Sequence, residues 1–227
     1  MVLDLAHRIE AVQARIADAA ARSGRSSNDV TLIAVSKTVN RDVVDEAYAL
    51  GLRQFGENRV QDSVAKYACP LPGDARLHMI GQLQSNKASA AIRLFDVIQS
   101  VDRGSLISAL EKHAASSGKT VDVLLEISVA GEAQKAGCPL SQVDELTGLI
   151  LDSPSLNLLG FMTMAPYTAT AEEARPVFSE LRSIRDRLAD KLGLPFPWLS
   201  MGMTNDFEVA IEEGATHVRV GRAIFAE

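Results

Sequence analysis

Short apolar runs alternate with longer amphipathic stretches along almost the whole chain, and this alternation constrains the fold more than any other feature. The runs are rich in Val, Ile and Leu, a composition typical of strands that are buried on both faces. Eight strands are predicted in this way, at residues 30–36, 54–56, 77–80, 97–99, 121–129, 156–161, 198–200 and 217–220.

Helices are predicted in the intervals between these strands. Asp102 and Ser141 are placed to cap two of them, and glycines stand just after several helices, where a left-handed residue closes the last turn. These glycines are Gly51, Gly118, Gly193 and Gly214. The predicted helices cover residues 41–50, 59–66, 87–94, 103–116, 141–151, 171–192 and 206–213.

One more helix is predicted ahead of the first strand. Residues 3–22 carry apolar side chains at steps of three and four, which share one helical face, namely Leu5, Ile9, Val12, Ile16 and Ala20. Together with the strand–helix units, this predicts an α/β fold, a single-domain TIM (β/α)8 barrel over residues 1–227 with an extra N-terminal helix. The alternative, an open doubly wound sheet, is disfavoured because no glycine-rich fingerprint follows the first strand.

Composition excludes several classes of protein. The net charge is −6 and the basic residues are scattered among acidic ones, so no nucleic-acid surface is predicted. Cys69 and Cys138 lie far apart without metal-ligand spacing, which favours a reducing compartment and argues against a zinc site. No apolar stretch reaches the roughly 20 residues that span a bilayer, and the N-terminus lacks a signal-peptide pattern. We therefore expect a cytoplasmic protein without a membrane partner.

Lys37 stands at the end of the first predicted strand, which is an unusual place for a cation. In α/β barrels the C-terminal ends of the strands face the ligand. A lysine that is desolvated there becomes nucleophilic towards aldehydes, so Lys37 is a candidate for forming a Schiff base. The alternative is that the side chain extends out of the strand end into solvent and carries no chemistry.

Polar residues follow several other strands, and the last two loops are the most informative. The segment from Ser200 to Thr204 supplies two hydroxyls and a glycine ahead of a helix, and Gly221 lets main-chain N–H groups approach an anion. These loops are the recurrent phosphate site of TIM barrels. Because the eighth strand lies beside the first in a closed barrel, a phosphorylated aldehyde held there would reach Lys37. The alternative is that Ser200 and Thr204 only cap the following helix.

Arg219 is predicted to point into the barrel, because it shares a strand face with His217 and the end of the first strand follows the same alternation. A buried arginine needs a partner. From the residues alone two partners remain open: a pyridine nitrogen of a ligand, or a barrel carboxylate such as Glu57 or Glu126.

Five segments carry a recognisable pattern: IAVSKT at 33–38, FGENRVQ at 55–61, HMIGQLQSNK at 78–87, LSMGMTND at 199–206 and VRVGRAIF at 218–225. They closely resemble segments of the pyridoxal phosphate homeostasis proteins, and the likeness covers nearly the whole chain. These proteins look like the barrel domain of alanine racemase standing alone. The resemblance therefore implies that the chain binds pyridoxal 5′-phosphate (PLP).

The resemblance implies that PLP is held as an internal aldimine on Lys37, with Arg219 facing the ring nitrogen. It places the phosphate among Ser200, Thr204, Gly221 and the Arg222 amide, and it suggests that Asn58 lies near the ring. The implied cofactor-binding residues are Lys37, Asn58, His78, Met162, Ser200, Met201, Thr204, Arg219, Gly221 and Arg222. Ser128 departs from the family, which usually has an asparagine in the fifth-strand motif.

Two features argue against catalysis. An arginine at the ring nitrogen disfavours its protonation, which makes the ring a weaker electron sink. A racemase also needs acid–base groups on both faces of its substrate, and the resembling racemases take one from a second domain. Tyr67, Tyr167 and His78 are the candidates for that role here, and their alternative interpretation is packing.

We therefore expect a protein that stores or delivers PLP and contributes to intracellular PLP homeostasis without robust catalysis of its own. Its expected partners are PLP and, transiently, apo enzymes that require PLP, and we expect a monomer. The alternative is a PLP-dependent amino-acid racemase or a related enzyme. A third hypothesis is an aldolase that uses Lys37 without PLP.

Overall fold

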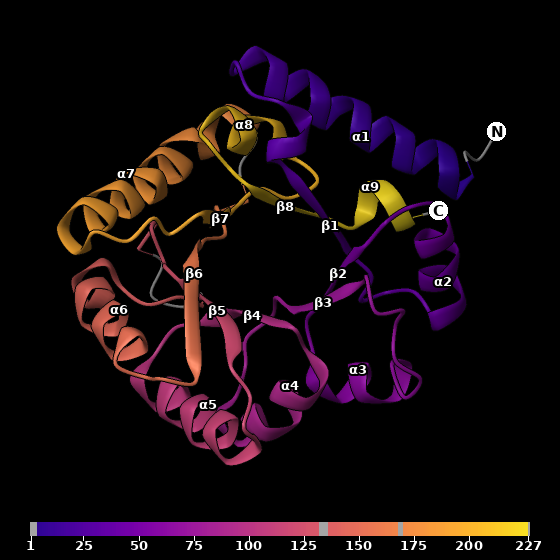
Figure 1. Cartoon of the computed structure of the whole chain (residues 1–227). Coiled ribbons are helices and arrows are strands. Elements are labelled where there is room, and N and C mark those ends of the chain that lie inside the picture. The colour runs from indigo at the N-terminus through magenta and orange to yellow at the C-terminus, as the bar shows by residue number, and fades with distance from the viewer. Residues whose placement is uncertain (1–3, 132–135, 168–169, 227) are drawn as a thin grey trace.

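The computed structural model describes residues 4–131, 136–167 and 170–226. Its parallel strands close into a barrel in the order of the sequence, with helices around it (Figure 1). The predicted TIM barrel is confirmed, and the open doubly wound sheet is excluded. The strands are β1 (Thr31–Val35), β2 (Gln54–Glu57), β3 (Arg76–Met79), β4 (Val97–Val101), β5 (Val121–Glu126), β6 (Leu156–Met162), β7 (Trp198–Ser200) and β8 (His217–Val220).

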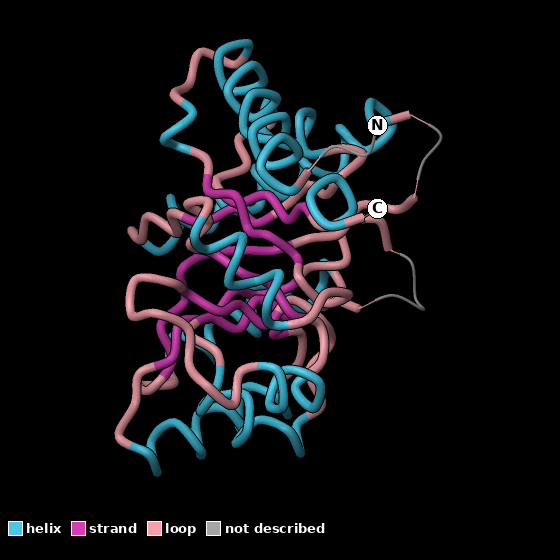
Figure 2. Tube along the Cα trace, turned by 90° about the vertical axis from the view of Figure 1, so that its right-hand side faces the viewer, coloured by secondary structure: helices cyan, strands magenta, loops and turns pink. Residues whose placement is uncertain are grey.

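A helix follows each strand, and Figure 2 shows the strands as a central band with helices on either side. The helices after the strands are α2 (Arg41–Ala49), α3 (Val60–Lys66), α4 (Ala88–Leu94), α5 (Gly104–Ser117), α6 (Val143–Leu151), α7 (Arg175–Leu192), α8 (Phe207–Glu212) and α9 (Arg222–Phe225). Short 3-10 turns are η1 (Ser27–Asp29), η2 (Ser85–Lys87), η3 (Leu140–Gln142) and η4 (Ala171–Ala174). None of the helices in these described ranges is both long and apolar enough to cross a membrane.

The predicted N-terminal helix is α1 (Leu5–Arg22), and the apolar face expected from the sequence is buried. It packs against α8 and α9 on the outside of the barrel (Figure 1). Arg15 and Arg22 form ion pairs with α8, at 2.6 Å to Glu208 and 2.8 Å to Glu212. The first helix thereby joins the N-terminal part of the chain to the last two strand–helix units.

Two layers of side chains hold the barrel. Residues such as Ala34, Phe55 and Leu125 point outward and belong to the apolar core beneath the helices. Residues of the opposite parity point inward, and several of these are polar. His78 hydrogen-bonds to the side chains of Gln54 and Gln99, at 2.7 and 3.0 Å. The barrel interior is therefore partly a hydrogen-bonded network, not a wholly apolar core.

The glycines predicted to follow helices adopt positive φ angles, which confirms their role. The angles are 99° at Gly51, 64° at Gly118, 66° at Gly193 and 99° at Gly214. The prediction of caps at Asp102 and Ser141 is wrong. Arg103 precedes α5 without a capping hydrogen bond, while the Asp102 carboxylate pairs with Arg103 at 2.6 Å. Ser141 lies inside η3, so α6 begins only at Val143.

The fifth strand is shorter than predicted. It ends at Glu126, whereas the apolar run predicted a strand to residue 129. Ile127 forms an isolated bridge with Cys138, and the Cys138 N–H donates to the Glu126 carbonyl at 2.8 Å. The segment after β5 therefore pairs with a later part of its own loop, which a local apolar pattern does not reveal.

Candidate functional site

The C-terminal ends of β1, β2 and β8 meet at one mouth of the barrel. Val35 pairs with Gly56, and Ala34 pairs with Val220. Lys37 after β1, Asn58 after β2 and the loop after β8 therefore lie side by side. The expectation that the eighth strand neighbours the first is confirmed.

Lys37 lies in the turn that follows β1, and it is exposed. In the described parts of the chain its amine forms neither a hydrogen bond nor an ion pair. The amine is therefore available for reaction. The protein does not desolvate it, in contrast to the sequence-based expectation of a lysine shielded at the strand end.

Two glycines bring the flanking loops close together. A Cβ on Gly221 would meet the Val35 carbonyl oxygen at 3.0 Å, so the loop after β8 lies directly against the end of β1. Gly202 has a φ of 91°, and a Cβ there would meet the Ala210 Cβ at 2.6 Å. Because these two positions carry no Cβ, the loop after β7 packs closely on α8. For the same reason the loop after β8 packs closely on the strand that leads to Lys37.

The hydroxyls predicted for the phosphate differ in their surroundings. Ser200 is buried, and its Oγ donates to Gln99 Oε1 at 2.6 Å and accepts from Arg219 Nη1 at 2.8 Å. Thr204 is half-buried, and Arg222 is exposed at the start of α9. Neither Thr204 nor Arg222 has a side-chain partner among the residues that the structure covers. Thr204 therefore provides the hydroxyl that is free.

Arg219 points into the barrel as predicted, with only 3% of its surface exposed. Besides Ser200, it donates from Nη2 to the Thr163 carbonyl at 2.9 Å. Burial lowers the pKa of Arg219 to about 10, while Glu126 and Asp206 act in the opposite direction. Glu57 is not its partner, because Glu57 pairs with Lys66 at 2.8 Å.

Glu126 is a member of this site that sequence reasoning named only as an ion-pair alternative. It is the last residue of β5 and is 1% exposed, and neither of its carboxylate oxygens has a hydrogen-bond partner in the described structure. Burial first and the charge of Asp102 second raise the pKa of Glu126 to about 7, and Arg219 opposes this shift. The only sequence signal for it is an acidic residue at inward parity in an apolar strand.

Three other predicted residues lie at different depths. Asn58 is half-buried at the mouth, where Gly81 lies so close that a Cβ on it would meet the Asn58 carbonyl oxygen at 2.3 Å. Met162 and Met201 are buried at the ends of β6 and β7. His78 pairs with Gly56, one layer deeper, and both of its ring nitrogens are hydrogen-bonded. Burial holds the pKa of His78 well below its ordinary value, so the ring is neutral.

The candidate acid–base groups do not converge on the mouth. Tyr67 is buried on the outer side of the barrel wall, where its hydroxyl donates to Glu57 at 3.0 Å. Burial, and then the charge of Glu57, raises the pKa of Tyr67. Tyr167 is 85% exposed. The packing interpretation therefore suits Tyr67 and His78 better than a catalytic one. The covered ranges also contain no group of His, Cys, Asp and Glu that could hold a metal ion.

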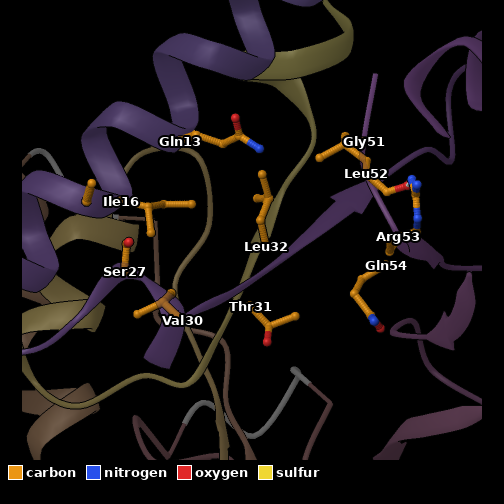
Figure 3. A pocket seen from close by; sticks show the side chains of 11 residues that line it. Gln13, Ile16, Ser27, Val30, Thr31, Leu32, Gly51, Leu52, Arg53 and Gln54 are labelled. Atoms are coloured by element: carbon orange, nitrogen blue, oxygen red, sulfur yellow. The ribbon is translucent and has the colours of Figure 1, made fainter. Parts of the chain in front are cut away.

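Two surface hollows lie at opposite ends of the strands. One of about 360 Å³ lies at the amino ends of β1 and β2, beneath α1, and Figure 3 shows Gln13, Thr31 and Arg53 among its lining residues. In TIM barrels that end serves stability. The other, of about 380 Å³, lies beside Asn58 and is also lined by Arg59 and Lys87. Only this second hollow adjoins the mouth that carries Lys37.

Comparison with known proteins first defines the class of barrel. A family model described as the N-terminal domain of alanine racemase matches residues 8–227. A pyridoxal phosphate homeostasis protein of Aquifex aeolicus is 41% identical over 225 residues, which cover 99% of both chains. The Escherichia coli K12 protein of that name is 36% identical, with 98% of this chain and 96% of the relative covered.

A solved structure agrees with this classification. PipY of Synechococcus elongatus PCC7942, determined with PLP bound, superimposes with a TM-score of 0.85 at 34% identity and covers 98% of this chain and 100% of its own. The chain belongs to the pyridoxal phosphate homeostasis protein family, whose barrel is of the alanine racemase N-terminal type.

Proposed function

We propose that this protein binds PLP as an internal aldimine on Lys37 and stores or delivers it within the cell, without robust catalysis of its own. The observation that carries the proposal is the exposed amine of Lys37, which has no partner among the described residues and lies beside the close-packed loop at Gly221. A family relative was solved with PLP bound, and other relatives are named for PLP homeostasis, which supports the proposal.

The residues at the mouth fit the cofactor. The phosphate would be bound by the hydroxyl of Thr204, which has no partner within the described ranges, and by the N–H groups of Gly221 and Arg222 at the N-terminal end of α9, which lack helical acceptors. The Ser200 hydroxyl would join them only by releasing Gln99, because its single O–H donates there. The guanidinium of Arg219 has further N–H donors beyond its two hydrogen bonds, so it can donate to a ring nitrogen.

PLP would supply an aldehyde. The Lys37 amine would condense with this aldehyde, and the carbonyl oxygen would leave as one water molecule. Met162 and Met201 are buried apolar side chains at the strand ends, where Met201 belongs to the core beneath the helices, and Asn58 would contribute an amide near the ring position. The remaining role of the protein is to hold the ring and keep this bond reversible.

Two arguments favour a carrier over a catalyst, and the first depends on Arg219 facing the ring nitrogen. A donating arginine opposite the ring nitrogen disfavours the pyridinium form that stabilises carbanions. Tyr67 and His78 are committed to buried hydrogen bonds, so neither is placed to move a proton at a substrate carbon. We further propose a monomer that meets apo PLP-dependent enzymes transiently.

Borohydride reduction of the PLP-loaded protein tests the site. Reduction traps the imine, so the mass of the cofactor should appear on the peptide that contains Lys37. Lys37→Ala should abolish the visible aldimine absorption while leaving the far-UV spectrum intact, and Lys87→Ala serves as the control because Lys87 lines the neighbouring hollow. Attachment mainly to Lys87, or to Lys135, which lies outside the described residues, would contradict the assignment.

The rival functions predict other results. A racemase would exchange the α-hydrogen of free amino acids with deuterated solvent across a panel of substrates. An aldolase that uses Lys37 without PLP would be colourless as purified.

A further inference from the structure

Lys66 is a lysine whose side chain is largely enclosed and that the proposed function does not use. It ends α3, and only 11% of its side chain is exposed. Its amine donates to Glu57 Oε1 at 2.8 Å and to the Ser36 carbonyl at 2.7 Å. The same carboxylate oxygen accepts from Ser36 Oγ at 2.8 Å and from Tyr67 at 3.0 Å. We call these four residues the Lys66 cluster.

The cluster fixes the residue that directly precedes Lys37. The Ser36 N–H donates to the Gly56 carbonyl at 3.0 Å, and the Ser36 Oγ donates to Glu57. The Ser36 carbonyl accepts from both the Val39 N–H, at 3.1 Å, and the Lys66 amine. Every polar group of Ser36 is therefore bonded, and the main chain enters Lys37 in one fixed direction.

The cluster lies on the outer side of the barrel wall. Ser36 and Glu57 have the parity of the outward residues Ala34 and Phe55, and Lys66 reaches them from α3. Its side chains therefore do not contact a ligand in the mouth. A buried ion pair is also a poor source of stability, because apolar replacements are often neutral or stabilising. A role in geometry accounts for it better than a role in stability.

We propose that Lys66, Glu57 and Ser36 are positioning residues for the Schiff-base lysine, holding the turn at Lys37 so that its amine meets the cofactor aldehyde. The inference rests on the proposed function, because it assumes that Lys37 binds PLP covalently. Imine formation requires the amine to approach the carbonyl carbon in a narrow range of positions, so small displacements of the turn are costly.

Two ligands separate positioning from general damage. Pyridoxine 5′-phosphate has the ring and phosphate of PLP but a hydroxymethyl group in place of the aldehyde, so it binds without forming an imine. Lys66→Met should weaken PLP binding by roughly tenfold to a hundredfold. It should leave the affinity for pyridoxine 5′-phosphate within twofold of wild type. Lys66→Arg, which can still donate to both acceptors, should recover part of the PLP affinity.

Two further variants keep the test decisive. Lys66→Met combined with Glu57→Gln removes both charges and so leaves the net charge of the cluster unchanged; the selective loss of PLP affinity should persist. Lys119→Met is the matched control, because Lys119 also donates to a carbonyl, that of Ile92 at 3.5 Å, but at the opposite end of the barrel. Should the Lys66 variants fail to fold, Ser36→Ala gives the same comparison with a single hydroxyl removed.

Equal weakening of both ligands, or no weakening of either, would overturn the positioning role. Failure of the proposed function looks different. In that case the wild-type protein itself would bind PLP no more tightly than pyridoxine 5′-phosphate and would give no reducible link to Lys37.

Discussion

Glu126→Gln should stabilise the protein at alkaline pH and leave its stability unchanged at acid pH. The carboxyl of Glu126 is 1% exposed and has no hydrogen-bond partner within the described residues, so ionising it in place is unfavourable. Glutamine is uncharged at every pH and closely matches the protonated side chain in shape. The substitution therefore removes only the cost of ionisation.

The size and sign of the effect follow from the pKa of Glu126, which burial raises from an ordinary 4.5 to about 7. Below pH 4.5 the folded and unfolded states both carry the proton, so the carboxyl has no pH-dependent effect. Between pH 4.5 and 7 the unfolded state releases the proton and the folded state keeps it, so the wild-type stability falls as pH rises. A tenfold change in an ionisation constant corresponds to about 1.4 kcal/mol, so the total loss is about 3 kcal/mol.

Urea denaturation at several pH values between 4 and 8.5, in the absence of PLP, measures this difference. The free energies of unfolding of wild type and Glu126→Gln should agree at pH 4 and diverge up to pH 7, with the variant about 3 kcal/mol more stable above that point. Glu10→Gln on the exposed surface of α1 controls for the loss of one negative charge. A difference that is the same at every pH would refute the reasoning, since it would show that Glu126 ionises as it does in the unfolded chain.

Three further predictions concern the mouth. Thr204→Val should weaken PLP by about 1.5–3 kcal/mol but barely affect pyridoxal, measured by titration with both ligands; equal losses would place the phosphate elsewhere. Gly221→Ala adds a Cβ that would lie 3.0 Å from the Val35 carbonyl oxygen, so PLP affinity should fall while the melting temperature changes little. Arg219→Glu should raise the protonation of the PLP ring nitrogen, followed by NMR with isotope-labelled cofactor; an unchanged protonation state would exclude Arg219 as the ring partner.

The barrel was predictable because its signals are local. β7 and β8 have the predicted bounds, since Pro197 directly precedes β7 and Gly221 directly follows β8. The errors arise where a distant partner decides the structure. β5 stops at Glu126 because the loop folds back through Cys138, and Asp102 does not cap α5 because its carboxylate pairs with Arg103.

The candidate site was predictable to the level of strand order and side-chain parity. Those two rules place Lys37 beside Gly221 and turn Arg219 inward. They do not reveal which hydroxyls are free, because the partners of Ser200 come from β4 and β8. The Lys66 cluster could not be predicted for the same reason. It combines Glu57 of β2 and Lys66 of α3 with Ser36, which follows β1.

The exposure of Lys37 itself bears on the choice between a carrier and a catalyst. An enzyme that stabilises a carbanion gains from excluding water, because a closed site strengthens the electrostatic interactions within it and prevents hydrolysis of reactive intermediates. The described residues leave Lys37 exposed in a turn at the barrel mouth. An imine formed there is open to water and to the lysine amine of an acceptor enzyme, and either nucleophile releases the cofactor. The accessibility that would make this lysine a poor centre for racemisation is therefore what a reversible store of PLP would require, and the proposed role of the Lys66 cluster would be to hold the amine in position for recapture.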